Sequence, residues 1–492
     1  MSVSATSAPA PAKPTGKKPH GLTFWMQRVL EECDRAGTHL AADPVHDLRV
    51  ALRRCRSMAD GLMAIDPDPS WKQMKRAGKL LFSKLGELRD VQVMQEWVHK
   101  LSSPDDRVTG TMLRFLAHRE AQHKQEAAQA LQDFDRKLWK KWATSLPRRA
   151  ARIPIGGLIF KHLALERWTE AYALHRRAMR THSQLAWHSL RIGIKRFRYI
   201  VENFLPQHHE SWINDLKELQ DMLGEIHDFD ILWSAALEIK AFPDAHDQHR
   251  WHTKILEERN RRIESYRNKM VGKASRWRVW RAQLPAGKQI ESAALNRLRI
   301  WASILDPDFR HSRHVSRLAL QLYDGLALSA EDHERDNERD VLRIAALLHD
   351  VGLSKKQKGH HKASYRLIEK VPAPLGLNQE TLRMAAVVSR YHRGALPRGQ
   401  KAFVQIPASD RHVVLKLAGI LRLANAFDAD HSGRIHRLDA SAKDGRFVIA
   451  AQGYNARDRM AESIAAGRHL LEVVYRRPIM VKALRAVLRP RP

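Results

Sequence analysis

The sequence is poor in cysteine, since Cys33 and Cys55 are the only two in 492 residues. Two isolated thiols exclude a disulfide scaffold, and neither has the paired spacing of a zinc-binding motif. Long apolar runs are missing as well: no segment has the uninterrupted apolar length that crosses a bilayer, and the N-terminus has no signal-peptide core. We therefore expect a cytoplasmic protein without a membrane span, whose residues 1–20, rich in Ala, Pro and Lys, form a disordered arm.

Acidic residues are also scarce relative to basic ones. The chain has 54 Asp and Glu against 85 Lys and Arg, a formal net charge of +31. Its hydrophobic content of 43% is that of a folded protein. Such a charge excess destabilises the compact state by self-repulsion and attracts polyanions, namely nucleic acid, anionic lipid or polyphosphate. Both halves of the sequence carry the excess, so composition alone does not locate a binding site.

Glycine is sparse between residues 22 and 284, where apolar residues recur every three or four positions. This period predicts helices, which end at stretches that contain proline. The best internal divider is the segment 147–157, which separates halves of about 21–146 and 155–284. We predict an all-α fold for this region.

A second break near Leu284 introduces a further region, about 291–492. It is again helical up to residue 426. Residues 434–439 and 446–451 carry alternating or β-branched residues around a Lys-Asp-Gly turn, which predicts a small β-hairpin. A last helix is expected from about residue 456 to 475.

An internal repeat is the most informative feature of the sequence. Segment 45–56 (VHDLRVALRRCR) matches segment 187–198 (WHSLRIGIKRFR), and each is followed by a Leu-Gly-Glu-x-x-Asp block, at 85–90 and 223–228. In both copies the basic residues fall at i, i+3, i+7 and i+10, a stripe about 80° wide on a helix. The two stripes consist of His46, Arg49, Arg53 and Arg56 in the first copy, and of His188, Arg191, Lys195 and Arg198 in the second.

Two interpretations of the stripes are open. In the first, they are structural: solvated faces, or bases paired with the block carboxylates Glu87, Asp90, Glu225 and Asp228. In the second, they bind phosphate. Stacked cations on one helix face repel one another, and a sequence that repeats the arrangement favours an anionic ligand. Arginine suits phosphate because its planar fork binds two oxygens and stays charged.

These stripes and blocks resemble the conserved-histidine α-helical domain family, CHAD, over about residues 21–284. The resemblance implies two pseudo-symmetric antiparallel helical bundles, with a basic groove or pore between them that binds inorganic polyphosphate. It also implies an association with polyphosphate granules in the cytoplasm. The phosphate-binding residues that it implies are the two stripes, with Arg54 and Arg196 as flanking bases.

The second region has a different constellation. It contains His311, the adjacent pair His349-Asp350, and a helix with Asn425 and Asp428. Imidazole and carboxylate groups are ligands for a divalent ion such as Mn²⁺, Mg²⁺, Fe²⁺ or Zn²⁺. Four other histidines leave alternatives open. His314, one turn from His311, is an alternative ligand, and His360, His361 and His392 either bind phosphate or a second metal, or are structural.

The motifs Ala-Leu-Leu-His-Asp-Val-Gly, Gly-His-His-Lys, Arg-Tyr-His-Arg and Leu-Arg-Leu-Ala resemble the HD phosphohydrolase superfamily. The resemblance is strongest to the C-terminal HD-like domain of the exopolyphosphatase and guanosine-pentaphosphatase family. It implies His311, His349 and Asp350 as metal ligands, with His349 and Asp350 catalytic. Asn425 stands where that family has its fourth ligand, an Asp, and Asp428 lies three residues further on. An amide oxygen is a weaker ligand, so weakened metal binding is expected.

Three functions remain open from the sequence. The first is a polyphosphate-binding protein whose HD-like region is a scaffold or regulator. The second is a metal-dependent phosphohydrolase acting on polyphosphate or a guanosine polyphosphate. The third is non-specific, salt-dependent nucleic-acid binding driven by the net charge of +31. The stripes lack the interleaved aromatic residues that stack on single-stranded bases, which argues against the third.

Overall fold

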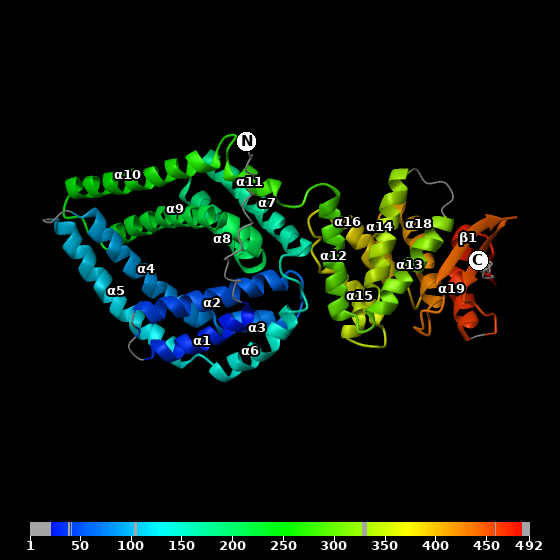
Figure 1. Ribbon diagram of the computed structural model, residues 1–492. Helices are drawn as coiled ribbons and strands as arrows, with labels where there is room; N and C mark the ends of the chain where they lie inside the picture. Colours follow the sequence, from blue (N-terminus) through cyan, green and yellow to red (C-terminus); the bar gives the residue numbers. More distant parts are fainter. Residues whose placement is uncertain are drawn as a thin grey trace, which may run out of the picture. The chain divides into compact units, whose positions relative to one another are not determined.

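The structure is a computed structural model, and it describes residues 21–37, 40, 42–102, 106–326, 332–457 and 459–484. The arm expected at 1–20 lies outside these residues. The chain forms two compact units, which divide between Pro285 and Ala286 (Figure 1). In the described part of the chain both units are helical, apart from one small sheet near the C-terminus, so the all-α prediction with a short β element is confirmed.

The first half of the first unit is built from α1 (Leu22–Ala36), α2 (Ala42–Met63), α3 (Pro69–Ala77), α4 (Lys79–Leu101), α5 (Arg107–Gln132) and α6 (Arg136–Ala150). The break after α2 has a clear local cause. Asp68 caps α3 by accepting a hydrogen bond from the Ser70 N–H at 2.8 Å, and Pro69 occupies the first helical position, where no N–H is needed.

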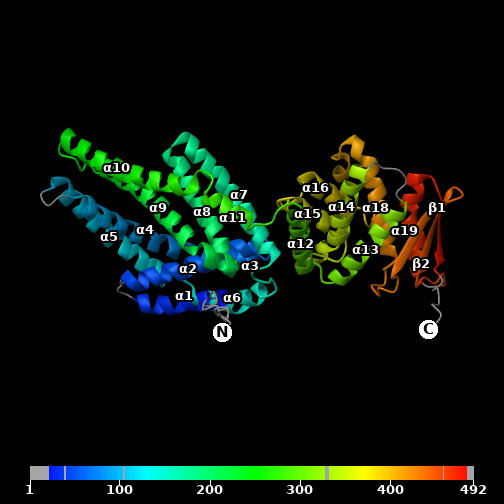
Figure 2. The ribbon, with the colours of Figure 1, turned by 45° about the horizontal axis from the view of Figure 1, so that its top comes forward.

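The second half is built from α7 (Leu158–Thr181), α8 (Gln184–Phe204), α9 (Pro206–Glu238), α10 (Ala245–Met270) and α11 (Arg276–Ala282). Pro206 separates α8 from α9 because it cannot continue the first helix but opens the next. Both halves thus repeat a short pair of helices followed by a long pair, as Figures 1 and 2 show.

The two halves meet in two places. Helix α2 packs on α8 where Gly61 admits the ring of Phe204; a Cβ at Gly61 would collide with that buried ring. At the far ends of the long helices, α4 and α5 pack against α9 and α10, with the rings of Trp97 and Phe229 4.5 Å apart. These contacts fix the spacing between the helices that carry the two stripes.

The second unit consists of α12 (Lys288–Leu305), α13 (Phe309–Leu326), α14 (Asp332–Leu348), η1 (Val351–Ser354), α15 (His360–Glu369), α16 (Gln379–Arg390), α17 (Lys401–Val404), η2 (Ala408–Asp410), α18 (Arg411–Ala426) and α19 (Arg459–Tyr475), with strands β1 (Arg437–Lys443), β2 (Arg446–Gln452) and β3 (Ile479–Ala483). One continuous apolar core joins α12, α13, α14, α16, α18 and α19 to the sheet.

The predicted hairpin exists, since β1 and β2 pair antiparallel with Lys443 opposite Arg446. The structure adds a third strand that the sequence did not predict. Strand β3 adds to the other edge of β2, in parallel, with Phe447 opposite Ile479. A parallel pair needs a crossover, and α19 provides it. The short β3 follows Arg476-Arg477-Pro478 and has no turn signal of its own, so its sequence does not predict a strand.

No helix among the described residues combines the length and the apolar character that a membrane crossing requires.

Candidate functional site

The two basic stripes lie on α2 and α8, which each bury one apolar face and leave the stripe on another. Leu48 and Leu52 are fully buried on α2, and Leu190 and Ile194 are fully buried on α8. This alternation of faces follows from the helical period. The stripe residues are therefore only partly covered, and their positions depend on how α2 and α8 face each other.

The inner residues of both stripes converge. We call Arg49, Arg53, Arg191 and Lys195 the basic cluster. Burial lowers the pKa of Lys195 to about 7, with further lowering by Arg191, Arg53 and Arg49 in that order. Two arginines of α2 thus lower the pKa of a lysine on α8, so the cations of both repeats lie in one region.

Among the described residues, no ion pair or hydrogen bond holds the head groups of the basic cluster. The carboxylates that influence them come from the Leu-Gly-Glu-x-x-Asp blocks. Burial raises the pKa of Asp90 on α4, although Arg49 and Arg191 oppose the shift. Burial likewise raises the pKa of Asp228 on α9 to about 6. Positive charge therefore predominates in this region.

The outer bases of the stripes have protein partners instead. Arg54 forms an ion pair with the buried Glu202 and donates to Oδ1 of Asn203 at 3.3 Å. Arg56 donates to the carbonyl of Lys75 at 2.5 Å. These contacts tie α2 to α8 and to α3.

Arg198, which matches Arg56 in the second copy, donates to Oε1 of Gln220 at 2.8 Å. His188 lies beside His227, with their Nδ1 atoms 3.4 Å apart, and burial lowers the pKa of His227 to about 4. His46 and Arg196 are exposed. Of the ten residues predicted to bind phosphate, the structure brings four together in the basic cluster. Three of the others form hydrogen bonds with the protein.

The glycines of the two repeated blocks differ in their surroundings. A Cβ added to Gly86 would stand 3.3 Å from Cζ of Arg49 and closer still to its Nη1. At the matching Gly224 a Cβ would meet nothing within 4 Å. Gly86 therefore leaves room for the guanidinium of Arg49, which also lies over the ring of Phe82.

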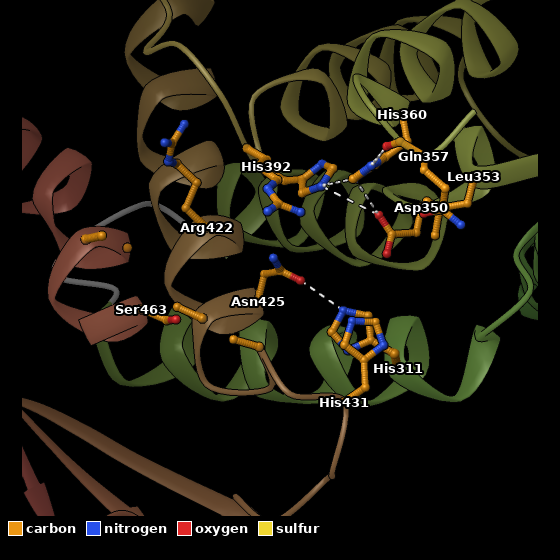
Figure 3. A pocket seen from close by; sticks show the side chains of 15 residues that line it. His311, Asp350, Leu353, Gln357, His360, His392, Arg422, Asn425, His431 and Ser463 are labelled. Atoms are coloured by element: carbon orange, nitrogen blue, oxygen red, sulfur yellow. Dashed lines mark hydrogen bonds and ion pairs between the residues drawn. The ribbon is translucent and has the colours of Figure 1, made fainter. Parts of the chain in front are cut away.

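The second unit contains a group of imidazoles around one carboxylate (Figure 3). His311, His349 and Asp350 offer ligand atoms that lie within 4.8 Å of one another, and Asp350 forms a second such group with His360 and His392. The five residues come from α13, the end of α14, α15 and the end of α16. All of them except the fully buried His349 border a cavity of about 450 Å³.

Three of these imidazoles are held in the same way. The Nδ1 atoms of His349, His360 and His392 lie 2.7–2.9 Å from the carbonyl oxygens of Ala346, Gln357 and Ser389, each three residues earlier. A carbonyl oxygen only accepts, so each Nδ1 carries a proton, and in the neutral ring each Nε2 carries the lone pair. This arrangement of a donor on one ring nitrogen and a lone pair on the other is typical of metal-binding histidines.

The Nε2 atoms point toward Asp350. His360 Nε2 lies 3.2 Å from Asp350 Oδ1 and 3.2 Å from His392 Nε2, and His392 Nε2 lies 3.6 Å from Asp350 Oδ1. Ligands about 2.1 Å from a tetrahedral ion are about 3.4 Å apart, so these residues fit a divalent cation. Burial would raise the pKa of Asp350, but His349, His360 and His392 outweigh it and lower that pKa.

The residues around His311 have divided roles. Its Nε2 lies 2.9 Å from Oδ1 of Asn425, and its Nδ1 lies 2.8 Å from Oδ2 of Asp428. Asp428 also accepts from the Gly433 N–H at 2.7 Å. Asp428, predicted as a metal ligand, thus holds the far nitrogen of His311, whereas Asn425 faces the nitrogen directed at Asp350. His314 and His361 lie outside both groups.

Two arginines that the sequence interpretation did not assign also line the cavity. Arg422 donates to the carbonyls of Tyr391 and Gly394, at 3.1 and 3.0 Å, and Arg393 lies beside it. Arg393 lies in the Arg-Tyr-His-Arg motif and Arg422 in the Leu-Arg-Leu-Ala motif, so these motifs are the sequence signal from which both could have been assigned. Their charge makes the cavity suited to an anion beside a metal.

The comparisons with known proteins agree with this division. Residues 27–237 match the CHAD domain family. The first unit contains a CHAD domain. Residues 294–461 match domain III of the Ppx/GppA phosphatases, so the second unit is related to the exopolyphosphatase family. A crystal structure of the CHAD domain from the plant Ricinus communis is 17% identical, with a TM-score of 0.38, covering 58% of this chain and 98% of that chain.

The ion pair of Arg54 generates a prediction about the stability of the CHAD domain. Arg54→Met leaves the carboxylate of Glu202, which is 7% exposed, without its main partner. We expect the free energy of unfolding to fall by about 2 kcal/mol, below the full cost of breaking a buried pair because Arg54 is partly exposed. Urea denaturation followed by circular dichroism measures the change.

Arg196 is the control, because it occupies the matching position in the second copy and is exposed. Arg196→Met is expected to change the unfolding free energy by less than about 0.5 kcal/mol. Equal effects of the two substitutions would contradict the packing role assigned to Arg54.

Proposed function

We propose that the CHAD domain binds inorganic polyphosphate, free or in granules, at the basic cluster. The observation that supports this proposal is the contrast between inner and outer bases. Arg54, Arg56 and Arg198 form hydrogen bonds or ion pairs with the protein, whereas the four cations of the basic cluster form none among the described residues. An extended anion would relieve their mutual repulsion and accept their hydrogen bonds.

A phosphate chain fits this arrangement better than nucleic acid. The three arginines of the basic cluster can each bind two phosphoryl oxygens. The one aromatic residue between the stripe residues, Phe197, is fully buried, so the stripes offer no ring on which a base could stack. Charge-driven binding of nucleic acid remains the competing function, and competition between polyphosphate and duplex DNA at physiological salt separates the two.

Removing two cluster arginines tests the proposal. Arg53→Gln/Arg191→Gln takes one guanidinium from each repeat, and two lost charge-assisted hydrogen bonds correspond to about a 100-fold weaker affinity for polyphosphate. Calorimetric titration with polyphosphate of defined chain length measures the affinity. The charge-matched control is Arg177→Gln/Arg261→Gln, at two exposed positions on α7 and α10.

A second variant perturbs the cluster without removing charge. Gly86→Ala is expected to displace Arg49 and weaken binding, whereas Gly224→Ala has open space and should leave the affinity unchanged. Both substitutions raise helix propensity by a similar amount, so stability does not explain a difference. Unchanged polyphosphate affinity in both the double variant and Gly86→Ala would eliminate the proposed site.

Binding should also be coupled to proton uptake. The pKa of Lys195 is about 7 because of burial and the neighbouring Arg191, Arg53 and Arg49, so at pH 8 its amine is mostly neutral. A bound polyanion favours the charged ammonium and raises this pKa, so we expect uptake of up to one proton at pH 8 and weaker binding as pH rises above 7. Titrations at pH 8 in two buffers with different ionisation enthalpies measure the uptake.

Lys195→Arg is the control because a guanidinium stays charged throughout this range. Proton uptake at pH 8 should fall in this variant while binding is retained. If uptake is the same in both proteins, it originates from the ligand or another group, and the role of Lys195 is wrong.

We further propose that the second unit is an HD-type metal site with phosphohydrolase activity on polyphosphate or a guanosine polyphosphate. The specific support is the set of three imidazoles whose lone pairs face Asp350. His311, His349 and Asp350 would hold one divalent ion, and Asp350, His360 and His392 a second. A bound ion would lower the pKa of a water and polarise a phosphoryl oxygen. Arg393 and Arg422 are placed to hold substrate phosphates.

Asn425 limits the metal affinity in this proposal, because its amide oxygen offers no charge to an ion beside His311. We expect Asn425→Asp to raise the amount of Mn²⁺, Fe²⁺ or Zn²⁺ retained per chain. Metal analysis of purified protein after dialysis measures the content, and phosphate release from polyphosphate provides a second readout.

The control for added charge is Asn455→Asp, at an exposed position outside the cavity. Metal retention should be unchanged in this variant and abolished by His349→Ala. Wild-type and Asn425→Asp proteins that both retain no ion and release no phosphate would rule out the metal site, without affecting the proposal for the CHAD domain.

A further inference from the structure

The second unit has a basic pocket that is separate from the histidine cavity. Five arginines line it, and we call it the arginine pocket: Arg299 on α12, Arg310, Arg313 and Arg317 on α13, and Arg343 on α14. Its volume is about 560 Å³, and none of its lining residues borders the histidine cavity. It is therefore an independent feature of the second unit.

Helix α13 presents two different faces. Arg310, Arg313 and Arg317 fall at i, i+3 and i+7, the same spacing as the first three residues of each CHAD stripe, and lie within about 60° of one another. His311 lies on another side of the helix, where it is buried beside Asp350. One helix thus contributes to the histidine group and, separately, to the arginine pocket.

The charges of the arginine pocket are poorly compensated. Arg343 pairs with Asp340 at 3.3 Å, and Arg317 donates to Nδ1 of His314 at 2.8 Å, a contact that adds no negative charge. In the described ranges no carboxylate contacts the guanidinium groups of Arg299, Arg310 or Arg313, and none lines the pocket. Guanidinium groups gathered from three helices repel one another, and a multiply charged anion would stabilise the arrangement.

We infer that the arginine pocket binds a phosphoanhydride chain, either a stretch of inorganic polyphosphate or the phosphate tail of a nucleotide. Several forked guanidinium groups around a concave site match successive phosphoryl groups. The lining has no Phe, Tyr or Trp side chain, and its residues other than arginine are His314, Ser316, Leu320 and Leu347. Base stacking is therefore not available to a single-stranded nucleic acid at this site.

This inference rests on the proposed function only for the identity of the ligand. If both hold, each unit has a site for a phosphate chain, in addition to the histidine cavity.

The test counts binding sites on the full chain with tripolyphosphate as the probe. The pocket variant is Arg310→Gln/Arg313→Gln/Arg317→Gln. The charge-matched control is Arg383→Gln/Arg437→Gln/Arg446→Gln, three exposed arginines of the same unit outside the pocket. We expect the pocket variant to bind one tripolyphosphate fewer than the wild type and the control. Combining the pocket variant with Arg53→Gln/Arg191→Gln should weaken or remove one further site.

The outcomes separate the two proposals. A pocket variant that binds tripolyphosphate with unchanged stoichiometry and affinity overturns the inference, whereas an unchanged Arg53→Gln/Arg191→Gln variant overturns the CHAD site alone. If the triple variant does not fold, Arg310→Gln alone provides the test, since losing one charge-assisted contact should weaken pocket binding about tenfold or more. An unchanged affinity in that variant also overturns the inference.

Parallel titrations identify the source of the phosphate chain. Tighter binding of ATP than of tripolyphosphate to the Arg53→Gln/Arg191→Gln protein assigns the pocket to a nucleotide tail, and the reverse order assigns it to free polyphosphate. Retention of duplex DNA, with no binding of either small anion, overturns the inference in favour of nucleic acid.

Discussion

Repulsion between like charges is the constraint on which the CHAD domain depends. Arg49, Arg53, Arg191 and Lys195 come from two copies of one motif, and burial together with the three neighbouring arginines lowers the pKa of Lys195 to about 7. Such an arrangement does not hold itself together, because each cation disfavours the next. The contacts that maintain it lie elsewhere, in the packing of α2 on α8 and in the aromatic contacts where the long helices meet.

The basic residues of the repeat therefore have two tasks. The inner bases remain available to an anion, while Arg54, Arg56 and Arg198 fix the geometry of the domain. Arg54 illustrates the second task, since it joins α2 to Glu202 of α8 and thereby compensates a buried carboxylate. Adjacent arginines of the same chemical type, Arg53 and Arg54, differ in role because a rotation of 100° directs them to different neighbours.

Electrostatics also organises the second unit, but there the central group is a carboxylate and not a cluster of cations. Asp350 is a buried carboxylate surrounded by imidazoles, and their influence keeps its pKa low despite its burial. The histidines are oriented by backbone carbonyls three residues earlier, so the helix ends and turns determine where the lone pairs point. Rigid orientation of this kind reduces the cost of organising a metal site and so favours function over stability.

The sequence by itself determined the helical architecture, the internal repeat and the hairpin, because these depend on local periodicity and turn chemistry. It also identified the residue types of both sites. It did not predict β3, whose pairing with β2 depends on the crossover helix. Nor did it show that Arg54 pairs with Glu202 or that Asp428 contacts the far nitrogen of His311. It also did not show that the arginines of α13 line a pocket. Those distinctions depend on which side chains meet across helices far apart in the chain, and only tertiary packing decides this.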